Sequence, residues 1–179
     1  MLCVNGGPGS PAFAYVASNL QSRLEQPVWG WMGAGDVFGM ADGFIPSIGM
    51  RRFISGTPPI VGMLAMQDML DLVGEVGIDA IRVKSLALTD YALALVDEIL
   101  VPLGVAVATP RDHEHRGGHV TIRHSAFKRV KDILWSRDIL PDFRNPDGIR
   151  LGLSPLSTTF AELRLGIVAI GAALQEVAE

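Results

Sequence analysis

One arginine stands inside an apolar run, Gly148-Ile149-Arg150-Leu151-Gly152, near the end of the 179-residue chain. A guanidinium in such a strand needs an anion, and its planar fork holds a carboxylate through two parallel hydrogen bonds. Arg150 therefore predicts either a site for a small carboxylate ligand or a structural ion pair. Asp142 and Asp147 are nearby candidates for the pair, and the residue types alone leave both alternatives open.

The chain opens on a glycine-rich turn, Asn5-Gly6-Gly7-Pro8-Gly9, preceded by Leu2 and Cys3. Backbone N–H groups of such a turn can bind phosphate, but proline removes one donor and no Lys-Ser/Thr pair follows, as it would in a P-loop. A lysine two to four residues before this turn would be typical of a Schiff-base lysine at the end of a strand. Since Leu2 and Cys3 occupy that stretch, we expect a chain that starts just past a catalytic lysine.

Three histidines close together, His113, His115 and His119, suggest a metal site. No cysteine or further histidine completes a zinc-binding spacing around them. His113 and His115 also fall in the polar stretch 111–118, between two predicted strands. We therefore expect a solvated loop and no metal.

Composition limits the partners that the chain could have. Its 15 Lys and Arg against 19 Asp and Glu give a net charge of −4, which disfavours nucleic acid as a partner. No apolar run is long enough to span a bilayer, and no signal-peptide pattern begins the chain. With a single cysteine as well, we expect a cytoplasmic protein. The hydrophobic fraction of 49% predicts either a core buried on both sides or a large surface that faces a partner.

The first 103 residues divide into two predicted segments. Residues 1–57 are rich in Gly, Pro, Trp and Phe, and beyond a helix-like stretch at 11–24 they indicate loops that cover something else. Residues 58–103 predict two linking helices. The first is apolar on nearly all sides and should be buried, and it breaks at Gly77. The second runs over 79–103, with Asp79 as N-cap and Gly104 as its stop.

Residues 104–179 predict a small α/β domain. Strands are expected at 105–109, 119–123 and 149–153, and a helix that Ser125 caps at 125–137. Thr159 and Glu162 form a capping box that begins the last amphipathic helix. The order is β-β-α-β-α, which predicts a small sheet with helices on one face.

Taken together, these motifs resemble kynureninase, a pyridoxal-phosphate-dependent hydrolase of the aspartate-aminotransferase fold, or fold type I. The matching stretches, in the family's order and spacing, are 5–9, 26–33, 55–60, 84–90, 109–111, 116–120 and 142–156. The resemblance covers nearly the whole chain but only the C-terminal half of a family member. It implies an α/β fold, the C-terminal part of a fold-type-I enzyme, whose family reaction hydrolyses kynurenine or 3-hydroxykynurenine in tryptophan catabolism.

The resemblance also implies roles for four residues. Those matching Trp31 and Thr57 contact the phosphate of pyridoxal phosphate across a dimer interface. The arginine matching Arg150 binds the substrate α-carboxylate, in agreement with the interpretation of a strand arginine that needs an anion, and Gly56 is implied to lie at the substrate.

Four positions depart from the family pattern. Leu2 stands where the family has the cofactor lysine, Met1 where it has a tyrosine, Ala34 where it has a histidine and Ser157 where it has a tyrosine. The resemblance gives no counterpart to the family's N-terminal half. We therefore predict no covalent binding of pyridoxal phosphate and no activity of this chain alone.

Three interpretations remain open at this point. The chain could be a truncated kynureninase-like domain or pseudoenzyme. It could be a subunit of a split enzyme that donates Trp31, Thr57 and Arg150 to a companion chain carrying the lysine. It could also be a repurposed binding or structural homodimer. Separately, the high apolar fraction and the lack of packing partners for residues 1–57 predict that the chain is not a monomer.

Overall fold

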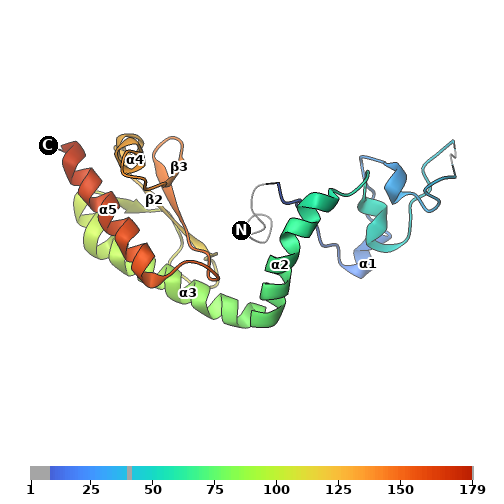
Figure 1. Ribbon diagram of the computed structural model, residues 1–179, viewed down its shortest axis with the longest axis horizontal. Helices are drawn as coiled ribbons and strands as arrows, with labels where there is room; N and C mark the ends of the chain where they lie inside the picture. The colour runs from blue at the N-terminus through green and yellow to red at the C-terminus, as the bar shows by residue number, and fades with distance from the viewer. Residues whose placement is uncertain (1–8, 40–41, 179) are drawn as a thin grey trace. The chain divides into compact units, whose positions relative to one another are not determined.

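The computed structural model describes residues 9–39 and 42–178 (Figure 1). Contacts group residues 1–72 into one compact unit and 73–179 into another, and the boundary falls inside helix α2 (Ile60–Val76). Among the described residues, no helix is both long and apolar enough to cross a membrane.

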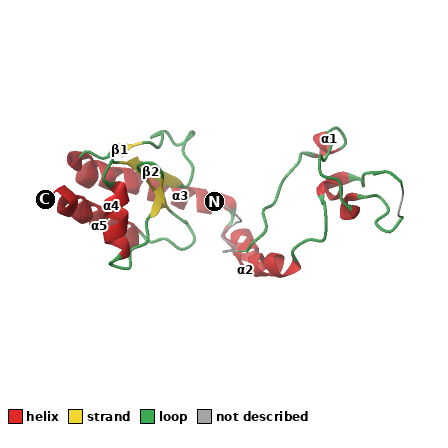
Figure 2. Ribbon diagram, turned by 90° about the horizontal axis from the view of Figure 1, so that it is seen from above, coloured by secondary structure: helices red, strands yellow, loops and turns green. Residues whose placement is uncertain are grey.

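The second unit is built on a four-stranded antiparallel sheet in the order β1-β2-β4-β3. Figure 2 shows its strands in yellow, with β1 and β2 labelled. The strands are β1 (Ala106–Val107), β2 (His119–Arg123), β3 (Asp142–Arg144) and β4 (Gly148–Gly152). In the register of the sheet, Arg150 lies between Thr121 of β2 and Asp142 of β3. Because side chains alternate along a strand, these three residues share one face, and Ile149 and Leu151 share the other.

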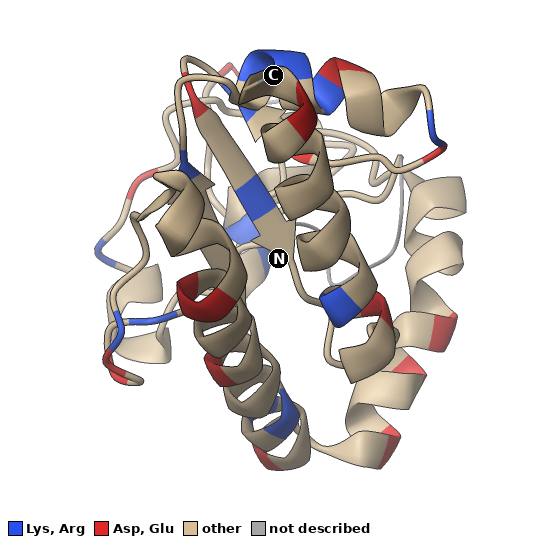
Figure 3. Ribbon diagram, turned by 90° about the vertical axis from the view of Figure 1, so that its left-hand side faces the viewer, with Lys and Arg blue, Asp and Glu red and all other residues tan. Residues whose placement is uncertain are grey.

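Three helices cover the face that carries Ile149. They are α3 (Ile78–Leu95), α4 (Phe127–Trp135) and α5 (Phe160–Ala178), and α5 packs against both of the others (Figure 3). Helix α3 continues through a π turn at Val96–Leu100 and a 3-10 turn at Val101–Leu103. Buried side chains of the helices and strands, among them Leu88, Val120, Phe127, Ile149 and Ile167, form one continuous core.

Several local predictions for this unit are confirmed. Gly104 ends the long helical stretch in the left-handed region, with φ of 88°, which glycine adopts without strain. Glu162 Oε2 accepts from the Thr159 backbone N–H at 2.9 Å, and Thr159 Oγ1 accepts from the Glu162 N–H at 3.1 Å, so the capping box begins α5. The predicted small sheet with helices on one face is also confirmed.

Three details of the prediction for this unit are wrong. The order is β-β-α-β-β-α, because β3 is a further strand that the sequence pattern did not reveal. Ser125 does not cap α4: Ala126 is the N-cap, and its N–H donates to His124 Nδ1 at 3.1 Å instead. Asp79 lies in the first turn of α3, and the N-cap is Gly77, whose φ of 79° suits glycine.

The first unit has little regular structure. The helix expected at 11–24 is wrong, because only α1 (Ser18–Gln21) forms there, followed by 3-10 turns at Trp31–Gly33 and Gly49–Phe53. The predicted burial of the first linking helix is also wrong. Within α2 the buried residue is Met66, and apolar side chains such as Val61, 83% exposed, face outward. A helix that is apolar on all sides is buried only where other elements surround it, and the described residues do not surround α2.

Candidate functional site

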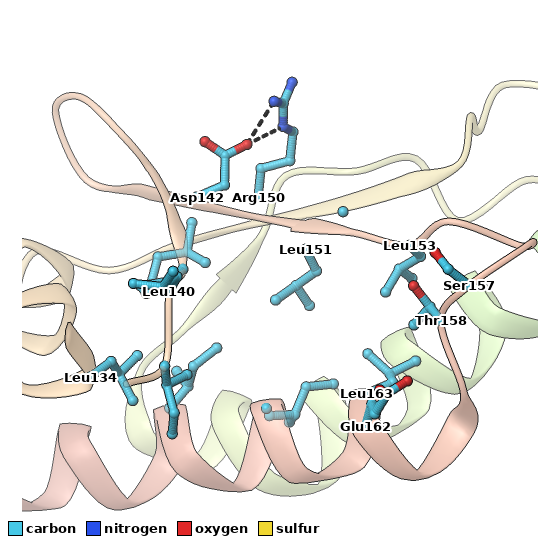
Figure 4. A pocket seen from close by; sticks show the side chains of 17 residues that line it. Leu134, Leu140, Asp142, Arg150, Leu151, Leu153, Ser157, Thr158, Glu162 and Leu163 are labelled. Atoms are coloured by element: carbon cyan, nitrogen blue, oxygen red, sulfur yellow. Dashed lines mark hydrogen bonds and ion pairs between the residues drawn. The ribbon is translucent and has the colours of Figure 1, made fainter. Parts of the chain in front are cut away.

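Arg150 lies on the sheet face opposite the helices, and the carboxylate of Asp142 meets it there. Both Nε and Nη2 of Arg150 donate to Asp142 Oδ2, at 2.7 and 2.6 Å (Figure 4). The two residues stand directly opposite each other on adjacent strands, which fixes the pairing. Each side chain is 37% exposed, so the pair is accessible to solvent and to a ligand.

A second arginine holds the other side of the same carboxylate. Arg144 Nε lies 2.8 Å from Asp142 Oδ1, and Arg144 Nη2 donates to Oδ2 at 3.1 Å. Burial raises the pKa of Asp142, but the hydrogen bonds from Arg144 and Arg150 outweigh it and hold that pKa below its ordinary value. Two guanidinium groups thus share one carboxylate, and the cluster keeps an excess of one positive charge.

His119 lies on the same strand face, at the start of β2 opposite Gly152. Burial lowers the pKa of His119, and the positive charge of Arg150 lowers it further, against the opposing effect of Asp142. The lowered pKa favours the neutral form of the His119 imidazole.

The structure assigns the two acids that the sequence left as alternatives. Asp142 occupies the fork of Arg150, whereas Asp147 accepts from Arg123 Nε at 2.9 Å and from Arg123 Nη2 at 3.0 Å. The sheet face therefore carries two separate Arg–Asp pairs, and in one of them a second arginine takes part.

A cavity of about 560 Å³ lies on the other side of β4, between the sheet and α5. Leu151 points into it, while Arg150 and Asp142 point away from it (Figure 4). Ser157, at one of the positions that depart from the family pattern, also lines this space. The fork of Arg150 and the cavity consequently open on opposite faces of the sheet.

In the first unit, glycines set the geometry of the turn that carries Trp31. A Cβ at Gly30 would fall 1.4 Å from the Ser55 carbonyl oxygen, and one at Gly33 would fall 2.6 Å from the Ile54 carbonyl oxygen. Only glycine permits so close a backbone approach. Ser55 Oγ also donates to the Val28 carbonyl at 3.1 Å. The turn is therefore held against the segment 52–55, two residues before Thr57.

Trp31 and Thr57 are both exposed residues. The Trp31 side chain is 49% exposed, and its ring packs at 6.2 Å, centroid to centroid, against Phe38 beside a cavity of about 800 Å³. Thr57 is exposed, and a Cβ at Gly56 would meet no atom within 4 Å among the described residues. Leu2, Met1 and the stretch 5–8 lie outside the described residues, so the prediction about the lysine position stays a prediction.

A buried arginine network, which the sequence analysis missed, secures the loop before β2. The Arg116 side chain is fully buried, donates from Nε to Thr89 Oγ1 at 3.0 Å and from Nη1 to the Arg111 carbonyl at 2.6 Å, and forms an ion pair with Asp90. The signal was present, since the stretches 84–90 and 116–120 both belong to the resemblance, but nothing in the sequence paired them.

The histidines of this loop are solvated and bonded to acids. His113 Nε2 lies 2.9 Å from Asp90 Oδ2, and His115 Nδ1 lies 2.7 Å from Asp112 Oδ2; both rings are more than half exposed. Across residues 9–39 and 42–178, no group of three or more His, Cys, Asp or Glu could hold a metal ion.

Comparison with known proteins gives the family. Residues 81–170 match the model of the kynureninase C-terminal domain. The kynureninase of Deinococcus radiodurans is 38% identical over 174 residues, covering 97% of this chain and 42% of the relative. The kynureninase of Burkholderia mallei strain SAVP1 is 40% identical over 160 residues, covering 89% of this chain and 38% of the relative. The chain thus spans about two fifths of the length of the curated relatives it matches.

Solved structures share the fold at low sequence identity. A cysteine desulfurase from Thermococcus onnurineus NA1 superposes with a TM-score of 0.67 at 17% identity, over 90% of this chain and 42% of that one. The cystine C-S lyase C-DES, in complex with cysteine persulfide, gives 0.70 at 14% identity, over 90% and 43%. These matches confirm the predicted fold class, the C-terminal α/β part of a fold-type-I enzyme, and they support the fold alone.

Proposed function

Because this chain belongs to the kynureninase C-terminal domain family, we propose that it forms the carboxylate-binding side of a site that hydrolyses kynurenine or 3-hydroxykynurenine to the corresponding anthranilate and alanine. The observation that carries this proposal is the fork of Arg150, which stands on a polar sheet face and is accessible to solvent. The α-carboxylate of the substrate is the anion that we propose this guanidinium binds beside Asp142.

The charge of the cluster supports that role. Asp142 neutralises only one of the two guanidinium groups of Arg144 and Arg150, so a ligand carboxylate brings the cluster to neutrality. Charge-assisted hydrogen bonds to a carboxylate are roughly twice as strong as neutral ones. Arg150 binds and orients the substrate in this proposal, and it takes no part in proton transfer.

Trp31 and Thr57 fit the phosphate of pyridoxal phosphate, the cofactor of the family. The indole N–H and the threonine hydroxyl are hydrogen-bond donors, and within the described residues neither donates to another group. Phosphate oxygens are strong acceptors for such donors. When bound, the cofactor supplies an electron sink to the reaction.

Covalent attachment of the cofactor needs a lysine at the position that Leu2 occupies. Leu2 has no amine, and Lys84, Lys128 and Lys131 lie on α3 and α4, away from any strand end. We propose that these 179 residues bind the cofactor noncovalently at most and are inactive as an isolated polypeptide, the lysine being supplied by a different segment or chain.

The apolar exposure of the first unit supports a partner. Val61, Leu64 and Ile48 are 83%, 68% and 96% exposed, and neighbouring side chains are similarly uncovered. Such a surface is typical of an interface. We propose either a homodimer or a companion chain carrying the lysine, which would make this chain a subunit of a split enzyme. Sedimentation equilibrium tests the proposal, and a monomer over a wide concentration range would contradict the homodimer.

A chimera tests the proposed reaction. The N-terminal part of the Deinococcus radiodurans relative is joined ahead of Met1, with and without Leu2→Lys, and the release of fluorescent anthranilate from kynurenine is measured. We expect hydrolysis with Leu2→Lys and none with the native Leu2. Addition of Arg150→Ala should abolish it. A Leu2→Lys chimera that is folded and loaded with cofactor, yet leaves kynurenine intact, would contradict the proposed reaction.

Borohydride trapping tests the attachment of the cofactor in the native chain. Pyridoxal phosphate and then borohydride are added, and intact mass is measured. We expect no stoichiometric adduct at a single lysine, whereas one saturable adduct at Lys84, Lys128 or Lys131 would overturn the noncovalent proposal.

A further inference from the structure

Asp142 uses one edge of the Arg150 guanidinium and leaves the other edge available. Arginine has five N–H donors arranged on two usable edges, Nε with Nη2 and Nη1 with Nη2. Asp142 Oδ2 accepts from Nε and Nη2 only. Within the described residues Nη1 donates to no acceptor, so the Nη1–Nη2 edge can receive a second carboxylate through two hydrogen bonds.

Asp142 is itself held in place from the opposite side. Arg144 binds Oδ1 at 2.8 Å, and the backbone pairing of β3 with β4 sets Asp142 directly across from Arg150. The carboxylate is therefore tied both by its strand and by a second cation. Asp142 can therefore keep its contacts with Nε and Nη2 of Arg150 while a ligand carboxylate binds at the Nη1–Nη2 edge.

We infer that Asp142 is a positioning residue for the carboxylate site: it orients the guanidinium of Arg150 so that the Nη1–Nη2 edge faces the α-carboxylate of an amino-acid ligand. Without this contact the arginine side chain would sample many rotamers, and a ligand would have to order it on binding. The inference rests on the proposed function, because the ligand it names is the substrate of that site.

The sheet face offers a matched control. Arg123 and Asp147 form a second Arg–Asp pair on the same face, with distances of 2.9 and 3.0 Å, and it involves neither Arg150 nor Asp142. Asp147→Ala removes an acid of the same type from the same sheet. An effect specific to Asp142 is thus separable from a general loss of stability.

The first measurement follows Arg150 without any ligand. Hydrogen exchange of the Arg150 Nε–H is recorded by ¹⁵N NMR in the wild type, Asp142→Ala, Asp142→Asn and Asp147→Ala, each checked for folding by its melting temperature. We expect Asp142→Ala to speed exchange about tenfold or more, the size of one charge-assisted hydrogen bond. The exchange rate in Asp142→Asn, whose amide oxygen still accepts a hydrogen bond, should lie between those of Asp142→Ala and the wild type. The rate in Asp147→Ala should match the wild type.

The second measurement is the affinity for kynurenine by titration calorimetry. We expect Asp142→Ala to weaken binding about tenfold, with the loss partly restored in Asp142→Asn and absent in Asp147→Ala. Tighter binding by Asp142→Ala would show that Asp142 competes with the ligand and would overturn the inference. Unchanged affinity together with unchanged exchange would overturn it as well.

The two measurements separate this inference from the proposed function. If the wild type binds no kynurenine, the proposed carboxylate site is contradicted, and the exchange data alone decide the role of Asp142. Slow exchange that depends on Asp142 then supports its positioning of Arg150, and fast exchange in the wild type overturns it.

Discussion

In residues 73–179, side chains from three helices and a sheet bury one another in a continuous core, whereas among the described residues up to Leu72 only Gly33 and Met66 are buried. The two units also position their candidate residues differently. Arg150 stands on a strand that its own unit supports. Trp31 stands on a turn held by backbone contacts of Gly30 and Gly33 with the segment 52–55.

This difference shows which packing contacts hold each candidate residue in place. The proposed carboxylate site, at Arg150, is carried by a unit that buries its own apolar surface. The proposed phosphate contacts, Trp31 and Thr57, lie in a segment whose apolar side chains are exposed, so we expect their geometry to depend on whatever covers that segment. We therefore expect the C-terminal unit to hold Arg150 in place alone, and the first unit to gain order from a partner.

Hydrogen exchange should show the largest contrast. We expect amides of α5 to exchange only through global unfolding and amides of the first unit to exchange through local opening. We expect protection of the Ile167 and Ile170 amides to exceed that of the Ile45 and Ile48 amides by about a thousandfold or more, as a domain with ordinary stability requires. Equal protection at a protein concentration where the chain is monomeric would contradict the comparison.

Replacing a phenylalanine by alanine should destabilise the chain much more in the second unit than in the first. Phe127 is fully buried, so Phe127→Ala should lower the free energy of unfolding by about 3–5 kcal/mol. Phe38 is 78% exposed, so Phe38→Ala should change it by less than about 0.5 kcal/mol. Urea titrations check both variants, and similar losses would mean that the first unit has a core of its own.

Buried and exposed ion pairs within the second unit refine the comparison. Arg116→Ala should lower the free energy of unfolding by about 2–3 kcal/mol, because it leaves the Thr89 hydroxyl and the Arg111 carbonyl without their buried donor. Arg111 pairs with Asp97 at 2.7 Å on the surface, and Arg111→Ala should lower the free energy of unfolding much less, because solvent screens an exposed pair. Chemical denaturation of both variants measures the difference, and an equal loss would show that burial does not matter here.

His119 should give the smallest effect, visible as a pH dependence. Its pKa is lower in the folded state than the ordinary value of 6.5, so the unfolded chain takes up the proton first as the pH falls. The contribution of His119 to stability is present above pH 6.5 and is lost as the pH falls through the folded pKa. Melting temperatures of the wild type should decline over this window, and those of His119→Gln should decline less. Parallel curves would contradict the lowered pKa.

The sequence was sufficient wherever a local pattern repeats. The capping box of Thr159 and Glu162 and the apolar periodicity after it predicted α5, and alternation predicted β2 and β4. β3 escaped because its three residues, Asp-Phe-Arg, lie between Pro141 and Pro146 and are too few to alternate visibly. α2 was misjudged because an apolar sequence shows that a helix can be buried, not that anything is present to bury it.

The site shows the same division between local and long-range information. An arginine in an apolar strand predicted an anion, and the structure supplies Asp142. The choice of Asp142 over Asp147 required the register of β3 against β4, which no local pattern reveals. The pair of Arg116 and Asp90 joins residues 26 positions apart, so only the packing of the loop against α3 could identify it.

Thermal melts with and without kynurenine, on the wild type and on Arg150→Ala, test the central claim most directly. If Arg150 binds the carboxylate on a unit that is stable without it, kynurenine should raise the melting temperature of the wild type. Arg150→Ala should melt close to the wild type without ligand, because a partly exposed pair contributes little, and should show no rise with ligand. A large fall in the melting temperature of Arg150→Ala, with no effect of kynurenine on the wild type, would contradict the account and make Arg150 a purely structural residue.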